Sequence, residues 1–227
     1  MGGHNIYIPR ILEIKYGLIY NWYALNYGIA NTGWHEPTET EVDILMNYLG
    51  GIVELGSTQE EEEETCKKLK SSDSNFWTLN IGNNSSGMDF RGTGDRSYID
   101  GTFQLIGTQS HIMTITPTFS DFFRGYALFD NHSISRSNGR KKHGRNIRLI
   151  KDSTSLSNGE TSTYTGNNGR IYPTICVGTQ EWLAHDLIET KYSDGNTIPE
   201  ITDNDDWIAL TTGALCAYDN DWTNVYE

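Results

Sequence analysis

The sequence has few cysteines, and their spacing is not that of a metal site or a disulfide framework. Cys66, Cys176 and Cys216 form an odd set without a Cys-x-x-Cys pair, so the chain predicts neither a disulfide framework nor a zinc site. Buried, reduced thiols are the simpler interpretation. A bridge between Cys176 and Cys216 is the alternative that the sequence leaves open.

Long apolar runs and excess basic charge are also missing. No segment approaches the roughly 18 apolar residues of a membrane span, and the first residues, Met-Gly-Gly-His-Asn, lack the basic and apolar regions of a secretory signal. The chain has 17 Lys and Arg against 30 Asp and Glu, a net charge of −13. Because such a surface repels a phosphate backbone, we expect no nucleic-acid partner, and we also expect no membrane insertion.

Catalytic patterns are absent as well. The six histidines show no His-x-x-x-His or His-Glu-x-x-His spacing, and Ser85-Ser86-Gly87 lacks the first glycine of a nucleophile elbow. We therefore expect no enzyme, no catalytic residues, no cofactor and no metal. Calcium is the weaker alternative, because residues 203–206 and 219–221 are rich in acids, but neither stretch has the spacing of an EF-hand loop.

Turn formers and aromatic residues are abundant. The 227 residues include 23 Gly, 13 Tyr and 6 Trp, which favours a loop-rich α+β protein, and a chain of this length can bury one substantial core or two small ones. The best helix is predicted at residues 39–49, where Thr38 and Glu41 have capping-box spacing. Its apolar stripe consists of Val42, Leu45, Met46 and Leu49.

The acidic run at residues 60–64 is predicted to be a solvated face or mobile loop, because only Cys66 and Leu69 after it could face a core. A basic run follows at Arg136, Arg140, Lys141, Lys142, Arg145, Arg148 and Lys151. We expect these cations to pair with acidic surface, the 60–64 run of the same or a neighbouring subunit being one candidate.

Two hairpins and a short helix are also predicted. Residues 124–130 and 133–136 flank a turn at Asn131-His132, and Asn138-Gly139 indicates another tight turn. Residues 175–177 and 180–183 flank Gly178-Thr179, and this hairpin is expected at a sheet edge. Residues 205–210 predict a short helix with Trp207 inward. Residues 6–14 are β-prone but contain Pro9, which favours an edge strand or a docking arm.

Several motifs resemble a known module in reversed order. Tyr16-Gly-Leu-Ile-Tyr-Asn-Trp-Tyr-Ala24, Gly33-Trp-His-Glu-Pro-Thr38, Asn84-Ser-Ser-Gly87, Gly101-Thr-Phe103 and Asn146-Ile-Arg-Leu-Ile150 are similar to the second half of the Fibrobacter succinogenes major paralogous domain. Its usual first half resembles Gly178-Thr-Gln-Glu-Trp-Leu-Ala184, Tyr192-Ser-Asp-Gly195 and Ala217-Tyr-Asp-Asn-Asp221. The resemblance implies a circular permutation, or a module completed by a neighbouring subunit.

The resemblance also implies a fold and a division of the chain. The fold is α+β, with a C-type-lectin-like small antiparallel sheet, one or two helices and long loops. The segments are an extended arm at 1–15, the second half at 16–151, a flexible linker at 152–168 and the first half at 169–227. Residues 171–226 are expected to pack against 16–150, with Trp22, Trp34 and Trp182 largely buried.

A binding role follows from the resemblance rather than from composition. In lectin-like relatives the variable face lies just before the last strand, which here corresponds to residues 111–145. The predicted ligand- or partner-binding residues are Arg124, Tyr126, Asn131, His132, Arg136 and Asn138. Relatives carry a Trp-Trp-Ser-Ser stretch where this chain has His111-Ile-Met-Thr-Ile-Thr116, so an aromatic sugar platform is not expected at that place.

The expected protein is a non-enzymatic phage virion component, such as a tail or head fibre or a receptor-binding adhesin. Its expected partners are other virion proteins, a host-surface glycan or protein, and further copies of itself. The missing secretion signal, the N-terminal arm and the reversed module order favour this interpretation. A bacterial secreted or cell-surface binding module of the same family is the alternative.

Overall fold

The computed structural model describes residues 15–226. Within them lie four α-helices: α1 (Trp22–Tyr27), α2 (Glu39–Leu49), α3 (Gln59–Leu69) and α4 (Asn204–Ala209). The strands pair antiparallel in several small sheets. The α+β class is therefore confirmed, with more helices than the one or two expected. The arm predicted at residues 6–14 lies outside the described residues.

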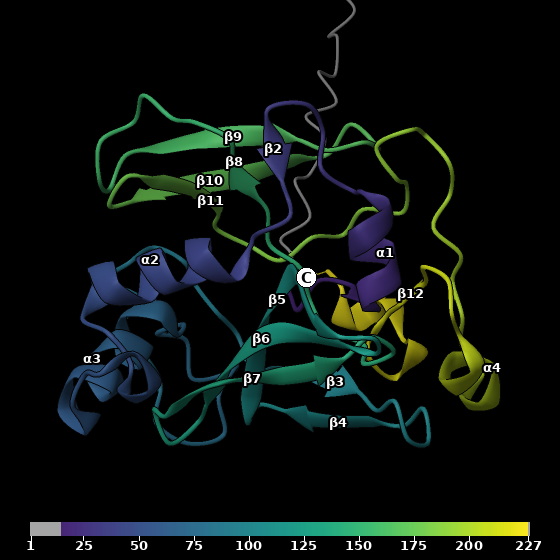
Figure 1. Ribbon diagram of the computed structural model, residues 1–227, viewed down its shortest axis with the longest axis horizontal. Coiled ribbons are helices and arrows are strands. Elements are labelled where there is room, and N and C mark those ends of the chain that lie inside the picture. The colour runs from purple at the N-terminus through teal and green to yellow at the C-terminus, as the bar shows by residue number, and fades with distance from the viewer. Residues whose placement is uncertain (1–14, 227) are drawn as a thin grey trace, which may run out of the picture.

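Two sheets form the main layers of the molecule. The larger has the order β2 (Trp34–His35), β8 (Ile150–Lys151), β11 (Gln180–Leu183), β10 (Ile171–Val177) and β9 (Thr161–Thr165). The other has the order β5 (Gln109–Phe119), β6 (Phe122–Phe129) and β7 (Ile134–Arg140). In Figure 1 the first sheet forms the upper layer and the second lies below it, with α2 running between them.

Smaller elements complete the fold. β1 (Ile19–Tyr20) pairs with β12 (Leu215–Cys216), and β3 (Thr93–Arg96) pairs with β4 (Phe103–Ile106). Short 3-10 helices occupy Val53–Leu55, Tyr218–Asn220 and Trp222–Asn224. No helix in the described part of the chain combines the length and apolar character needed to span a bilayer.

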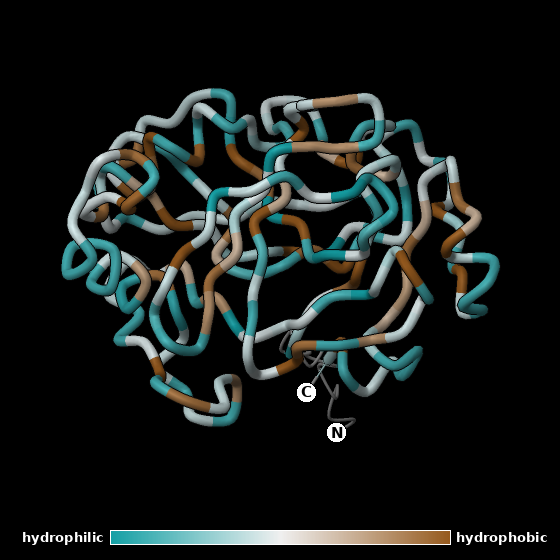
Figure 2. Tube along the Cα trace, turned by 60° about the horizontal axis from the view of Figure 1, so that its bottom comes forward, coloured by the Kyte–Doolittle hydropathy of each residue, from teal (hydrophilic) through white to brown (hydrophobic). Residues whose placement is uncertain are grey.

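Helix α2 ties the two sheets together, and its sequence explains how. Thr38 accepts from the Glu41 backbone while the Glu41 side chain accepts from Thr38, so the predicted capping box is confirmed. The predicted stripe is buried in a core cluster that also includes Tyr126 of β6 and Trp182 of β11. Hydrophobic segments run through the interior, and hydrophilic ones lie on many outer loops (Figure 2).

The C-terminal part of the chain shares a core with the N-terminal part. One cluster joins Leu18 and Leu149 to Leu187, Leu215 and Val225. Residues 171–226 thus pack against 16–150, as expected. The backbone N–H of Lys15 donates to the carbonyl of Val225 at 2.9 Å, so the two ends of the described chain lie side by side.

The three tryptophans expected in this core differ in burial. Trp22 and Trp182 are buried, as predicted. Trp34 is only half-buried, packing its ring against Tyr164 with the centroids 5.0 Å apart. Trp207 of α4 is fully buried, which confirms the short inward-facing helix.

The acidic run at residues 60–64 does not form a loop. It lies in α3, which begins with a second capping box between Thr58 and Glu61. Glu62 is buried, and its carboxylate accepts from the backbone N–H groups of Val53 and Ile134. The prediction of a solvated face is right for Glu60, Glu61 and Glu64, which are exposed, whereas the alternative of a mobile loop is wrong because the helix has a buried stripe that is partly polar.

Three strand assignments also need correction. Residues 161–165, taken as linker, form β9 and pair with β10. The hairpin of β10 and β11 is consequently interior to its sheet, since β9 and β8 cover its two sides. Asn138-Gly139 lies within β7 and pairs with β6 instead of forming a turn.

All three cysteines are free and buried, which confirms the reduced thiols and excludes the Cys176–Cys216 bridge from this structure.

Candidate functional site

The six predicted binding residues lie on the β6–β7 hairpin but not in one place. Arg124 is opposite Asn138, and Tyr126 is opposite Arg136, near the open end of the hairpin. Asn131 and His132 form the turn at the other end. Two of the six, Asn131 and Asn138, have exposed side chains.

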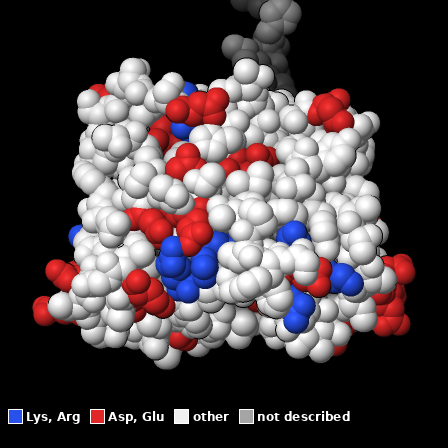
Figure 3. Space-filling view, viewed as in Figure 1, with Lys and Arg blue, Asp and Glu red and all other residues white. Residues whose placement is uncertain are grey.

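Arg124, Tyr126 and Arg136 make contacts within the fold. The Nε of Arg124 donates to Glu39 Oε1 at 3.0 Å, and the Nε of Arg136 donates to Asp43 Oδ1 at 3.2 Å. The hydroxyl of Tyr126 also donates to Asp43, and burial followed by this bond raises the pKa of Tyr126. Figure 3 shows a basic cluster against acidic side chains where α2 lies above the β6–β7 hairpin in the same view. The first role of the three residues is to hold the hairpin on α2.

His132 belongs to a second internal arrangement. Lys70 is fully buried, and its Nζ donates to the carbonyls of Asn80, Phe129 and Asp130 at 2.7, 3.1 and 3.1 Å. The ammonium lies 4.0 Å from the centroid of the Trp77 ring and 3.4 Å from His132 Nδ1. Burial lowers the pKa of Lys70 to about 8, and burial with the nearby Lys70 charge lowers the pKa of His132. This cluster fixes the β6–β7 turn.

Basic residues of the run at 136–151 form ion pairs with acids, as expected, but their partners are not the acids at residues 60–64. Arg136 meets Glu39 and Asp43 of α2, and Arg148 meets Asp186. Lys151 meets Glu181. Among the described ion pairs, none joins this basic run to the acids at 60–64, because those acids lie on α3, where Glu64 pairs with Lys67 and Glu62 faces inward.

The feature most suited to a ligand is an open hollow beside Trp34, which we call the Trp34 hollow. It has a volume of about 570 Å³. Its lining combines one aromatic ring with polar side chains from three separate stretches: Ala30, Asn31, Thr32, Gly33, Trp34, Asp152, Ser193 and Asp194.

One wall of the Trp34 hollow is set by the β2–β8 pairing. Trp34 is opposite Lys151, and the Asp152 backbone N–H donates to the Gly33 carbonyl at 3.0 Å. Gly33 has φ +87°, a conformation that favours glycine, and a Cβ there would meet nothing within 4 Å. The positive φ allows the chain to turn here, and no neighbouring atom fills the space beside Gly33.

His35 fixes the Asp152 carboxylate. Its Nδ1 lies 2.6 Å from Asp152 Oδ1, and its Nε2 lies 2.6 Å from Glu41 Oε1. Partial burial opposes protonation of the ring, but the bonds to Glu41 and Asp152 prevail and raise the pKa of His35. The other oxygen of Asp152 accepts no hydrogen bond from residues 15–226, and Asp152 is one of the residues that line the hollow.

The opposite wall is set by a tight turn. Asp194 Oδ1 accepts from the Asn196 backbone at 2.9 Å, and its Oδ2 accepts from the Tyr27 hydroxyl at 3.0 Å. The Tyr27 ring in turn packs on Tyr192, with centroids 4.2 Å apart. The bond from the Asn196 backbone is the main reason that the pKa of Asp194 is lowered. Both acids of the hollow are therefore held in position.

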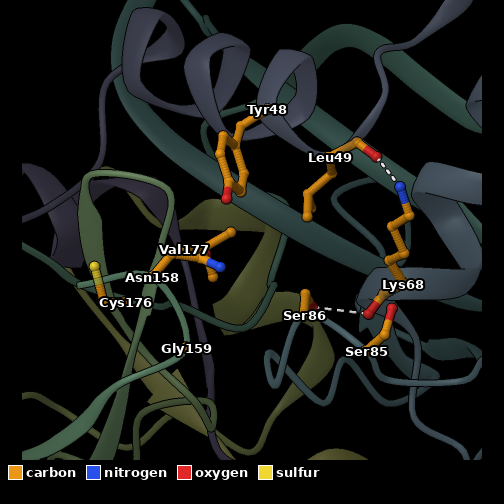
Figure 4. Close-up of a pocket in the computed structure, with 9 residues that line it drawn as sticks. All are labelled: Tyr48, Leu49, Lys68, Ser85, Ser86, Asn158, Gly159, Cys176 and Val177. Atoms are coloured by element: carbon orange, nitrogen blue, oxygen red, sulfur yellow. Dashed lines mark hydrogen bonds between the residues drawn. The ribbon is translucent and has the colours of Figure 1, made fainter.

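A second hollow lies between α2 and the β10 end of the large sheet (Figure 4). It has a volume of about 420 Å³. Tyr48 and Leu49 line one side, and Lys68 donates to the Leu49 carbonyl. Asn158 and Val177 face them, and the Cys176 thiol contacts the Leu156 carbonyl at 3.3 Å. Burial raises the pKa of Cys176, so this thiol is not activated as a nucleophile.

A buried group of titratable side chains lies on β3, on β5 and in the segment after β7. Asp95 Oδ2 is 3.5 Å from His111 Nε2 and 3.3 Å from His143 Nε2. Burial, followed by the charge of Arg145, lowers the pKa of His143 to about 3 and that of His111 well below its usual value. Burial raises the pKa of Asp95. Across residues 15–226, no three His, Cys, Asp or Glu side chains are arranged to hold a metal ion, and this includes both acidic stretches weighed for calcium.

Comparison with known protein families finds a match over residues 11–151. This range matches the Fibrobacter succinogenes major domain. The chain belongs to this family. No curated protein and no solved structure matches it. The family domain contains Trp34 and the β6–β7 hairpin, whereas Asp152, Ser193 and Asp194 come from beyond the matched range.

Sequence reasoning did not find the Trp34 hollow. Trp34 was interpreted as a core residue, and residues 192–195 as part of a family motif. No local pattern links Asn31, Asp152 and Asp194, which are brought together by tertiary contacts such as the β2–β8 pairing, the bond from the Ser193 backbone to Gly28 and the bond from Tyr27 to Asp194. The polar stretch Asn31-Thr-Gly33 directly before Trp34 is the one sequence signal that could have indicated it.

Proposed function

We propose that the protein is a non-enzymatic attachment module. The observation that carries this proposal is the Trp34 hollow, where one aromatic ring and two fixed carboxylates border an open surface. Such a surface suits recognition, because loops held by a rigid scaffold commonly bind ligands. The carboxylates are hydrogen-bonded to His35, Tyr27 and Asn196, so they are held in place for contacts with a ligand.

We place this module in a phage virion, as a tail or head fibre or a receptor-binding protein that attaches to a host surface. The support is the resemblance to lectin-like scaffolds, which phage receptor-binding proteins also use. The alternative is a bacterial secreted or cell-surface module of the same family. In either setting we expect partner proteins or further copies of the chain.

Two measurements test the proposal. Fluorescently labelled protein should bind to the surface of bacterial host cells and be displaced by excess unlabelled protein. A protein that binds no cell surface and no virion protein contradicts the proposal. Genes for capsid, portal and tail proteins beside this gene would support the virion setting, and outer-membrane or secretion genes would support the alternative.

A further inference from the structure

We infer that the Trp34 hollow binds a neutral glycan, with direct contacts and without a bridging metal ion. This inference rests on the proposed attachment function and adds the ligand class and the residues. It is carried by three features of the hollow, namely its aromatic face, its free hydrogen-bonding groups and its charge.

The aromatic face is the first feature. The Trp34 ring is half-buried, packs at a tilt against Tyr164 and lines the hollow, with the Lys151 ammonium 5.6 Å from its centroid. A sugar ring presents a patch of C–H groups that packs on such a surface. Because the indole is already fixed by packing, little side-chain freedom is lost on binding.

Free polar groups around the ring are the second feature. The indole N–H of Trp34, the hydroxyl of Thr32 and Oδ1 of Asn31 have no hydrogen-bond partner among residues 15–226. Asp152 presents its free carboxylate oxygen, and Asp194 has accepting capacity beyond its present bonds. A polyol supplies hydroxyls that both donate to the carboxylates and accept from the indole and threonine.

Charge decides between ligand classes. Two carboxylates disfavour an acidic sugar or a phosphate. A cationic ligand would compete with Lys151, whose Nζ already lies 5.6 Å from the Trp34 ring centroid. Since no three suitable side chains could hold a metal ion in the described chain, the hydroxyls would meet the protein directly. A neutral hexose-containing oligosaccharide satisfies each of these conditions.

The probe is a panel of neutral oligosaccharides built from glucose, mannose and galactose, with uronic-acid oligosaccharides for comparison. We expect at least one neutral member to bind, and titration calorimetry to give the same affinity with and without EDTA. Binding that is confined to acidic members, or that EDTA abolishes, overturns the inference.

Variants locate the site. Thr32→Arg places a long side chain in the hollow without altering the core, and we expect it to weaken binding at least tenfold. The matched control is Thr211→Arg, another exposed threonine outside both hollows, which should bind like the wild type. Asp152→Asn and Asp194→Asn should each lose about tenfold. Circular dichroism checks that every variant is folded.

The outcomes separate this inference from the proposed function. If the wild type binds no neutral oligosaccharide, or Thr32→Arg binds it normally, the glycan assignment is wrong. If labelled protein still attaches to cells in that case, the attachment function stands and another surface carries it. If neither the glycans nor the cells are bound, both proposals fall.

Discussion

Arg96 shows how single residues hold this fold together. It is fully buried on β3 and donates to the carbonyls of Gly101, Ile201, Thr202 and Asp203, at 2.8, 2.5, 2.9 and 3.1 Å. Its guanidinium is also 4.4 Å from the Trp207 ring centroid. A planar group with five N–H donors suits this set of acceptors, and a lysine ammonium does not.

Replacing this side chain should therefore be costly. We expect Arg96→Ala to lower the free energy of unfolding by about 3–5 kcal/mol, because it leaves several buried carbonyls without donors and removes packing from Trp207. Arg96→Lys should recover only part of the loss. Urea titration measures both, with Arg140→Ala at a half-exposed position as a control expected to cost under about 1 kcal/mol. A wild-type midpoint for Arg96→Ala would contradict this account.

The buried histidines predict a loss of stability in acid. His143 has a pKa of about 3 in the folded protein, against an ordinary value of 6.5. Between these values the unfolded chain binds a proton that the folded protein excludes, so stability falls as the pH drops through this window. The slope is up to about 1.4 kcal/mol per pH unit for each such histidine. Asp95, whose pKa is raised by burial, opposes the loss at the acidic end.

His143→Gln tests this directly. It removes one titrating group, so we expect its stability to change less steeply with pH between about 6.5 and 4 than that of the wild type. Denaturant unfolding at several pH values gives the two slopes. Equal slopes would show that another group controls the acid sensitivity.

At the scale of elements, α2 and α3 explain what the sequence could and could not predict. Both begin with a Thr-x-x-Glu capping box. The stripe of α2 is wholly apolar, so its periodicity was clear. That of α3 reads Glu62, Thr65, Cys66 and Leu69, and a buried glutamate that is paired with distant backbone N–H groups cannot be recognised from local pattern.

The cap of α3 gives a prediction at this scale. Thr58→Ala removes the side chain that accepts from the Glu61 backbone, and we expect a loss of about 1 kcal/mol in unfolding free energy. Thr40→Ala, at an exposed position inside α2, is the matched control and should change stability by less than about 0.5 kcal/mol. Thermal melts followed by circular dichroism compare the two, and equal melting temperatures would argue that the cap does not stabilise the helix.

Tertiary pairing accounts for the other differences between sequence and structure. The hairpin around Gly178 was predicted correctly, but its place in the sheet depends on β9, whose Thr-rich strand was read as a linker. The candidate site was less predictable still. The residues around Trp34 belong to segments about 120 and 160 positions further along the chain, and only the folded sheet brings them together.

At the scale of the whole molecule, the chain ends lie side by side. Lys15 and Tyr16 bond to the carbonyls of Val225 and Asn224, which is where the family order would join the two halves. The circular permutation itself stays a prediction. It implies that the order of the halves can be restored without disturbing the core, because neighbouring ends tolerate such rearrangement.

A rearranged chain tests this idea. We expect a variant whose residue 226 is joined to residue 15 through a short Gly-Ser linker, and which is opened between Ser155 and Leu156, to fold with one cooperative transition. The chosen opening lies in a loop without strand pairing. Residues 15–151 alone should not fold, since their core includes Leu187, Leu215 and Val225. A stably folded 15–151 fragment would contradict a shared module.

The pairing of β1 with β12 has a consequence for how the protein is made. Ile19 pairs with Cys216, and Tyr20 pairs with Leu215, so β1 cannot complete its pairing until a strand that lies about 200 positions later has been synthesised. Until then the apolar side chains of Leu18, Ile19 and Tyr20, which are buried in the native state, face solvent. Contacts between such distant residues close slowly because a long loop must first be ordered. The nascent chain is therefore exposed to aggregation until β12 has been made, and a chaperone that shields residues 18–20 should raise the yield of native protein.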